Sequence, residues 1–91
     1  TGGAGQETAR RHVVEMRGFE FHPAALSVAV GDTIVWVNKD LVAHTATSRP
    51  AGFDSGLIDV GKSWKYKVRK KGDVAYVCTF HPMMTGTLRV K

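Results

Sequence analysis

Apolar and polar side chains alternate along most of this chain. Leu26, Val28 and Val30 fall on one side of an extended segment. In residues 64–69 every second side chain is a lysine or arginine, and the intervening positions are aromatic or aliphatic. A period of two residues is that of a β-strand, and a strand with one basic side has one face in water. Since no window of ten or more residues has the period of a helix, the pattern predicts a protein made of strands.

The predicted strands are short and separated by turn-forming residues. Glycine, proline, asparagine and aspartate mark the breaks, as in Gly31-Asp32 and Asn38-Lys39-Asp40. We expect strands at 12–21 (interrupted at Gly18), 25–30, 33–38, 41–47, 57–60, 62–69, 74–78 and 86–91. Residues 79–85 should form a loop at one end of the molecule. Seven or eight such strands indicate an all-β sandwich or barrel.

The length of 91 residues suits a single domain. Residues 1–9 are rich in glycine and should form a flexible tail, and residues 10–91 should form the folded domain. No apolar run approaches the roughly 20 residues of a membrane helix, so no membrane span is expected. The chain starts at Thr1 without a methionine, which is typical of a processed protein.

The candidate chemistry lies in residues 76–84. This stretch contains Cys78, His81 and Met84 in the pattern C-x-x-H-x-x-M, together with Met83. Zinc sites rarely include a thioether, whereas thiolate and thioether ligands favour copper. A trigonal copper site with one cysteine and a weak axial methionine needs a second imidazole, and His44 is the candidate. Spacing alone cannot bring His44 to this loop, since it lies far upstream. His12 and His22 are alternatives, although solvated or hydrogen-bonded histidines are more frequent.

The sequence resembles the small cupredoxins, the blue copper proteins of the amicyanin and plastocyanin type. The matching motifs are Phe19-x-Phe21-x-Pro23, Val28-x-Val30-Gly31-Asp32-Thr33-Ile34-x-Trp36-x-Asn38, His44, and Tyr76-x-Cys78-Thr79-x-His81-Pro82-x-Met84-x-Gly86-x-Leu88-x-Val90. The resemblance implies a Greek-key β-sandwich and one copper ion held by His44, Cys78, His81 and Met84. Met83 competes for the axial role, but the three-residue step from His81 to Met84 matches the family, so Met83 is expected at the surface beside Pro82.

Two positions next to these residues depart from the usual pattern. Many relatives have asparagine after the upstream histidine, where its side chain connects the two ligand loops, but this chain has Thr45. Amicyanin and plastocyanin types also have proline before the second histidine, where this chain has Phe80. Because proline has no backbone N–H, Phe80 can donate a hydrogen bond to the Cys78 sulfur that proline cannot. We therefore expect Thr45, Thr79 and Phe80 to surround the ligands, and the reduction potential to be higher than with proline.

The resemblance implies a mononuclear type I copper protein that carries single electrons between transient redox partners. Electrons should enter and leave through an apolar patch that includes Pro82 and Met83. A monomer in the periplasm, or otherwise outside the cytoplasm, is expected. The net charge of +5 allows an acidic partner, although a solvated strand face explains most of it.

Several other functions compete with this interpretation. A copper carrier or resistance protein would use the same ligands. An enzyme with Cys78 as nucleophile would leave Met84 without a role and shows no orienting Asn or Asp. A multicopper oxidase needs His-x-His pairs, and nucleic-acid binding would need aromatic residues on the basic face. We therefore expect no enzymatic activity and no nucleic-acid partner.

Overall fold

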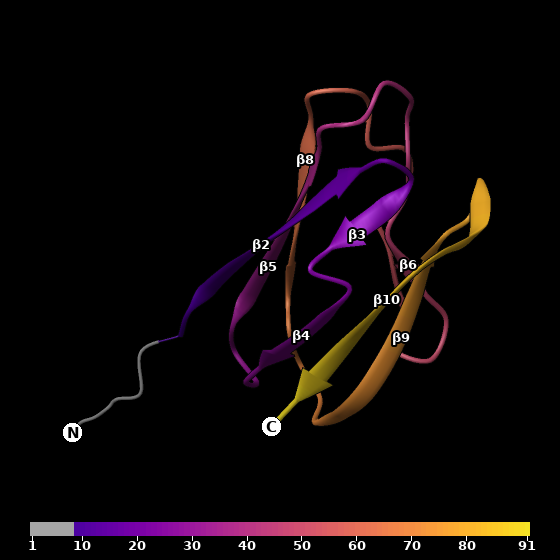
Figure 1. The fold of residues 1–91 in the computed structure, drawn as a ribbon. Helices are drawn as coiled ribbons and strands as arrows, with labels where there is room; N and C mark the ends of the chain where they lie inside the picture. Colours follow the sequence, from indigo (N-terminus) through magenta and orange to yellow (C-terminus); the bar gives the residue numbers. More distant parts are fainter. Residues whose placement is uncertain (1–8) are drawn as a thin grey trace.

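Two β-sheets pack face to face in the computed structural model, which describes residues 9–91 (Figure 1). One sheet has the order β3(Glu20–His22), β2(Arg11–Arg17), β5(Thr33–Asn38), β8(Ser63–Lys67). The other has the order β4(Ala25–Val28), β10(His81–Val90), β9(Gly72–Cys78), β6(Thr47–Ser48), β7(Phe53–Asp54). The predicted all-β sandwich is confirmed. Apart from Ala9, the expected N-terminal tail lies outside the described residues.

Strands distant in sequence are neighbours in both sheets. β2 runs parallel to β5, with Val14 opposite Trp36, and β4 runs parallel to β10, with Leu26 opposite Leu88. β8 pairs with β5 and β9 pairs with β10 in the antiparallel sense. The two parallel pairings place strands that are distant in sequence side by side.

Among residues 9–91 no helix has the length and apolarity of a transmembrane span.

The core lies between the two inner faces that the alternation predicts. Its largest buried side chains are Trp36, Tyr76, Phe21, Met16, Ile34 and Leu88. Gly86 on β10 faces the ring of Tyr76, and a Cβ added at this position would lie 2.3 Å from that ring. A glycine is therefore needed there for the two strands to pack. The basic residues Lys65 and Lys67 of β8 are exposed, as expected.

Three predicted boundaries were wrong, and each has a local cause. Residues 41–46 do not form a strand, and of the segment expected at 41–47 only Thr47 belongs to one, β6. The amide of buried Asn38 donates to the carbonyls of Val42 and Ile58, which replaces strand pairing by a fixed irregular loop. Residues 41–46 and 57–60 keep a single bridge, between His44 and Ile58.

The other two differences concern strand lengths. The expected loop at 79–85 is largely strand, because β10 already pairs with β9 at His81, opposite Cys78, and its register shifts before Thr85. Phe53, expected in a loop, lies on the short strand β7, where it pairs with Ser48. The described residues therefore have two very short strands, β6 and β7, that the alternation could not reveal.

Candidate metal centre

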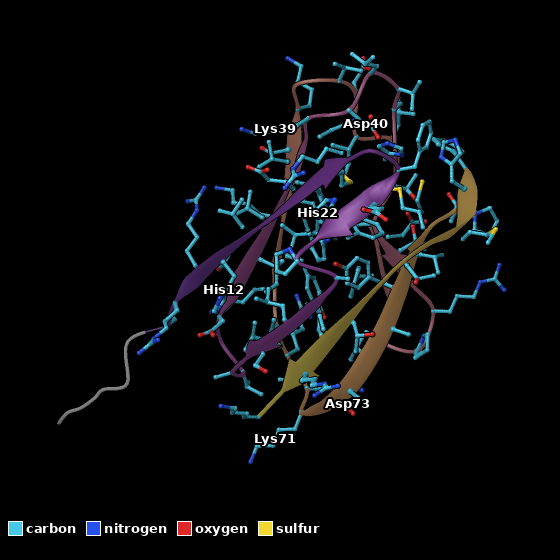
Figure 2. All side chains as sticks on the ribbon, viewed as in Figure 1. His12, His22, Lys39, Asp40, Lys71 and Asp73 are labelled. Carbon is cyan, nitrogen blue, oxygen red and sulfur yellow. The ribbon has the colours of Figure 1, made fainter. Side chains whose placement is uncertain are left out.

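The site forms where the β9–β10 hairpin meets the loop between β5 and β6, at one end of the sandwich. Figure 2 shows Asp40 of that loop at this end, and Lys71 and Asp73 at the opposite end. Cys78 is the last residue of β9, and its side chain is completely buried. His44 is also completely buried, whereas His81 at the start of β10 is partly exposed. One imidazole thus belongs to the interior and the other to the surface.

Three potential ligand atoms converge at this end. The Cys78 Sγ atom lies 3.6 Å from His44 Nδ1 and 3.7 Å from His81 Nδ1. The ligand atoms of all three residues lie within 4.8 Å of one another. The structure therefore brings together the lone cysteine and the two histidines singled out from the sequence.

The orientation of His44 is fixed through its other ring nitrogen. His44 Nε2 donates to Asp40 Oδ2 at 2.8 Å, and the same oxygen accepts the backbone N–H of Phe19 at 2.9 Å. The Phe19 N–H is the main reason why the pKa of Asp40 lies below its ordinary value of 3.8; burial opposes this effect and the His44 ring assists it. An ionised carboxylate on Nε2 leaves the lone pair of Nδ1 directed at the Cys78 sulfur, as in carboxylate–histidine–metal arrangements.

Thr45 connects the two loops in the role that asparagine has in many relatives. Its Oγ1 accepts the backbone N–H of Thr79 at 2.8 Å and lies 3.1 Å from Thr79 Oγ1. Its own backbone N–H donates to the Cys78 Sγ at 3.4 Å. The cross-link that the sequence left open is therefore made by a threonine pair. The hydrogen bond expected from the Phe80 N–H stays a prediction.

The two methionines have opposite environments. Met84 is buried, with 3% of its surface exposed, and Met83 is 96% exposed. Met84 lines a surface hollow together with Phe19, Phe80, His81, Pro82 and Met83. The hollow is mainly apolar, and the partly exposed His81 is one of its lining residues. That electrons enter and leave at Pro82 and Met83 stays a prediction.

The ring of Phe19 packs against both histidines of the site. Its centroid lies 4.9 Å from that of His81 and 5.7 Å from that of His44, edge to face in each case. The backbone of Phe19 has φ = 59°, a left-handed conformation that costs a bulky residue roughly 1–3 kcal/mol. The turn between β2 and β3 and the bond to Asp40 hold it there.

Sequence reasoning missed Asp40 and Phe19. An aspartate four residues before a predicted ligand was a usable signal for Asp40, but only after His44 had been chosen. Nothing in the sequence distinguishes the role of Phe19. His12 and His22 lie outside the site: His12 pairs with Asp32 at 2.8 Å, and His22 lies 3.2 Å from Glu20.

The donor set suits copper. A single thiolate excludes the common structural zinc sites with several cysteines. One thiolate and two Nδ1 imidazoles, with a buried thioether on the same hairpin, are the ligand types of blue copper centres.

Comparison with known proteins agrees with this chemistry. A profile of the copper binding proteins of the plastocyanin/azurin family matches residues 9–91. The chain is 25% identical over 84 residues to amicyanin of Paracoccus denitrificans, covering 87% of this chain and 64% of that protein. It is 38% identical over 69 residues to halocyanin of Natronomonas pharaonis, covering 70% of this chain and 42% of that protein. The chain therefore spans less than two thirds of either relative.

Solved structures show the same fold. A reduced amicyanin variant superposes with a TM-score of 0.81 at 27% identity, covering 88% of this chain and 81% of the other. A copper-containing nitrite reductase from Thermus scotoductus superposes with a TM-score of 0.80 at 28% identity, but this chain corresponds to only 22% of it. With the family profile matched over nearly the whole sequence, the chain belongs to the copper-binding proteins of the plastocyanin/azurin family, and its cofactor is copper.

Proposed function

We propose that this protein is a soluble one-electron carrier with a mononuclear type I copper site formed by His44, Cys78, His81 and Met84. The single observation that carries the proposal is the convergence of one thiolate and two imidazoles, one of them buried and the other at the surface. Bound copper supplies a couple between Cu(I) and Cu(II). The residues of the protein hold the ligands still and expose one edge of the site to partners.

The scaffold supports electron transfer because it limits movement of the ligands. Asp40 fixes the ring of His44, and the Thr45–Thr79 link joins the two ligand-bearing segments. A site whose ligands do not move when its charge changes has a low reorganisation energy, which favours fast electron transfer. Met84 supplies a weak axial ligand that tunes the potential.

The surface around His81 suits brief encounters with redox partners. Phe80 is 53% exposed and Met83 is 96% exposed, and both border His81 in the same hollow. Small apolar contacts are usual in redox complexes, which must dissociate quickly. We propose that the protein acts as a monomer outside the cytoplasm, that partners meet it at Pro82 and Met83, and that it is not an enzyme. That the partners are acidic stays a prediction.

A copper-carrier or resistance protein remains the second candidate, because it would use the same four ligands. The burial of His44, Cys78 and Met84 favours electron transfer, since a carrier must release its ion. Rapid loss of copper to a chelator would support the carrier, and fast electron self-exchange would support the electron-transfer function.

The test of the proposal is a titration of the purified protein with Cu(II), followed by visible absorption. One equivalent should produce an intense sulfur-to-copper charge-transfer band and a reversible one-electron couple. The Cys78→Ser variant should lose both. A weak d–d band alone, or a coloured Cys78→Ser protein, would contradict the proposal.

A further inference from the structure

The charge of this protein is concentrated at the end opposite the metal site. Eight of its 13 lysines and arginines lie at that end, and all eight are exposed: Arg10, Arg11, Lys67, Arg69, Lys70, Lys71, Arg89 and Lys91. The pairing of the strands places these cations close together. Lys67 and Arg11 both pair with Thr33, Gly72 pairs with Val90, and Lys91 donates its backbone N–H to Val28.

Among residues 9–91 few acidic groups balance these cations. Asp73 lies opposite Arg89 in the pairing of β9 with β10, and Asp32 is buried and already bonded to His12. Within residues 9–91 none of the eight cations forms an ion pair. By contrast, Lys39 and Arg17 both form ion pairs with Glu15, at 3.5 Å and 3.1 Å. The eight cations, which we call the basic end, therefore carry the net charge of the described domain.

A redox partner is a poor occupant of the basic end. Electrons must pass through the metal site, and Figure 2 shows Lys71 at the other end of the sandwich from Asp40. A specific protein interface also needs a buried apolar centre. The exposed aromatic and methionine side chains Phe80, Met83 and Phe19 lie beside His81, whereas the basic end exposes Val30 among its cations.

We propose that the basic end binds an anionic phospholipid surface and so orients the metal site toward the aqueous phase. The eight cations come from the start of β2, the end of β8 and the turn that follows it, and the end of β10, which lie at the same end of the sandwich. A spread of flexible cations suits a diffuse, multivalent anionic surface, where each Lys or Arg raises the affinity about fivefold. Binding there leaves the apolar patch around His81 free for partners.

The test is co-sedimentation of the copper-loaded protein with vesicles at about 0.15 M NaCl. Vesicles of phosphatidylglycerol and phosphatidylcholine should bind the protein, and vesicles of phosphatidylcholine alone should not. Replacing Arg69, Lys70 and Lys71 by glutamine should weaken binding about a hundredfold, since three cations near the surface are lost. A matched variant, Arg17→Gln, Lys39→Gln and Lys62→Gln, has the same net charge and should keep most of the binding.

A second measurement tests the orientation. A small neutral reductant should reduce the vesicle-bound protein as fast as the free protein, because the site faces water. Absence of vesicle binding, equal losses in the two triple variants, or a tenfold slower reduction on vesicles would overturn the proposal. Equal affinity for a short DNA duplex would also overturn it, because the basic end would then bind polyanions without preference.

Discussion

The sandwich contains two histidine–aspartate pairs of the same geometry, one at each end. His44 Nε2 lies 2.8 Å from Asp40 Oδ2 near the metal site, and His12 Nε2 lies 2.8 Å from Asp32 Oδ2 at the basic end. Both carboxylates also accept backbone N–H groups, from Phe19 in the first pair and from Arg10 and Ala29 in the second. The pairs differ in the other ring nitrogen, because that of His44 faces the Cys78 sulfur.

Because of this difference, the His12–Asp32 pair only stabilises the fold, whereas the His44–Asp40 pair also orients a ring nitrogen toward the Cys78 sulfur. Asp32 connects the start of β2 to the turn that follows β4, and His12 completes its set of donors. Asp40 connects the β2–β3 turn to the loop of His44, and in addition it holds the ring of the proposed ligand His44 with Nδ1 toward Cys78. A buried histidine–aspartate pair is therefore no sign of a metal site until the direction of the free nitrogen is known.

The largest expected effect comes from removing each histidine in turn. His44→Ala should abolish the intense charge-transfer band of the Cu(II) protein, because one of two imidazole ligands is lost. His12→Ala should bind copper with an unchanged spectrum, since its ring lies at the other end. Visible absorption after addition of one equivalent of Cu(II) measures both. Retention of the charge-transfer band in His44→Ala would mean that His44 is not a ligand and that the two histidine–aspartate pairs do not differ in function.

Removal of the two carboxylates is the next test. Asp40→Asn should reduce copper affinity about 10- to 100-fold, as is usual when the partner of a ligating histidine is changed. Asp32→Asn should leave the affinity unchanged. Competition with a chelator of known affinity gives both values. Equal affinities in the two variants would mean that Asp40 does not position His44.

Acid should affect the stability of the fold more through Asp32 than through Asp40, because the pKa of Asp32 is lowered further. Burial raises the pKa of Asp32, but hydrogen bonds from the Arg10 and Ala29 N–H groups and from His12 outweigh it and lower the pKa from 3.8 to about 2. A carboxylate with a lowered pKa stabilises the fold above pH 4, and this contribution is lost as the pH falls toward 2.

The shift corresponds to about 2 kcal/mol at most. Urea unfolding of the metal-free protein at several pH values between 5 and 2 should show this loss, and Asp32→Asn should show a flatter dependence. An equally steep loss of stability in Asp32→Asn would assign the acid sensitivity to other carboxyl groups.

The smallest effect concerns the sulfur that His44 faces. Phe80→Pro should lower the reduction potential, because proline has no N–H to donate to the Cys78 thiolate and the oxidised state is then favoured. Phe80→Ala keeps the N–H and serves as the control. Spectroelectrochemical titration measures both potentials, and an unchanged or raised value in Phe80→Pro would show that Thr45 alone supplies the hydrogen bond.

The sequence predicted the strands and the metal-binding hairpin better than the loop that completes the site. In residues 64–69 the alternation shows which side chains are buried, so β8 could be predicted. Cys78, His81 and Met84 are close enough in sequence to be recognised as one group. Asp40 and His44 lie on a loop without periodicity, and their geometry depends on Asn38 bonding two distant carbonyls. Such contacts form only once the tertiary structure exists, so no local pattern could predict them.

The parallel pairing of β4 with β10 has a consequence for the kinetics of folding. Leu26 and Leu88 must meet across most of the domain before the sheet that contains β4 and β10 is complete, and the loop-closure entropy of this contact is paid before its packing is gained. Sandwiches dominated by such pairings fold in milliseconds to seconds rather than microseconds. The chain should therefore spend a comparatively long time with Cys78 accessible, when oxidants and stray metal ions can reach its thiol.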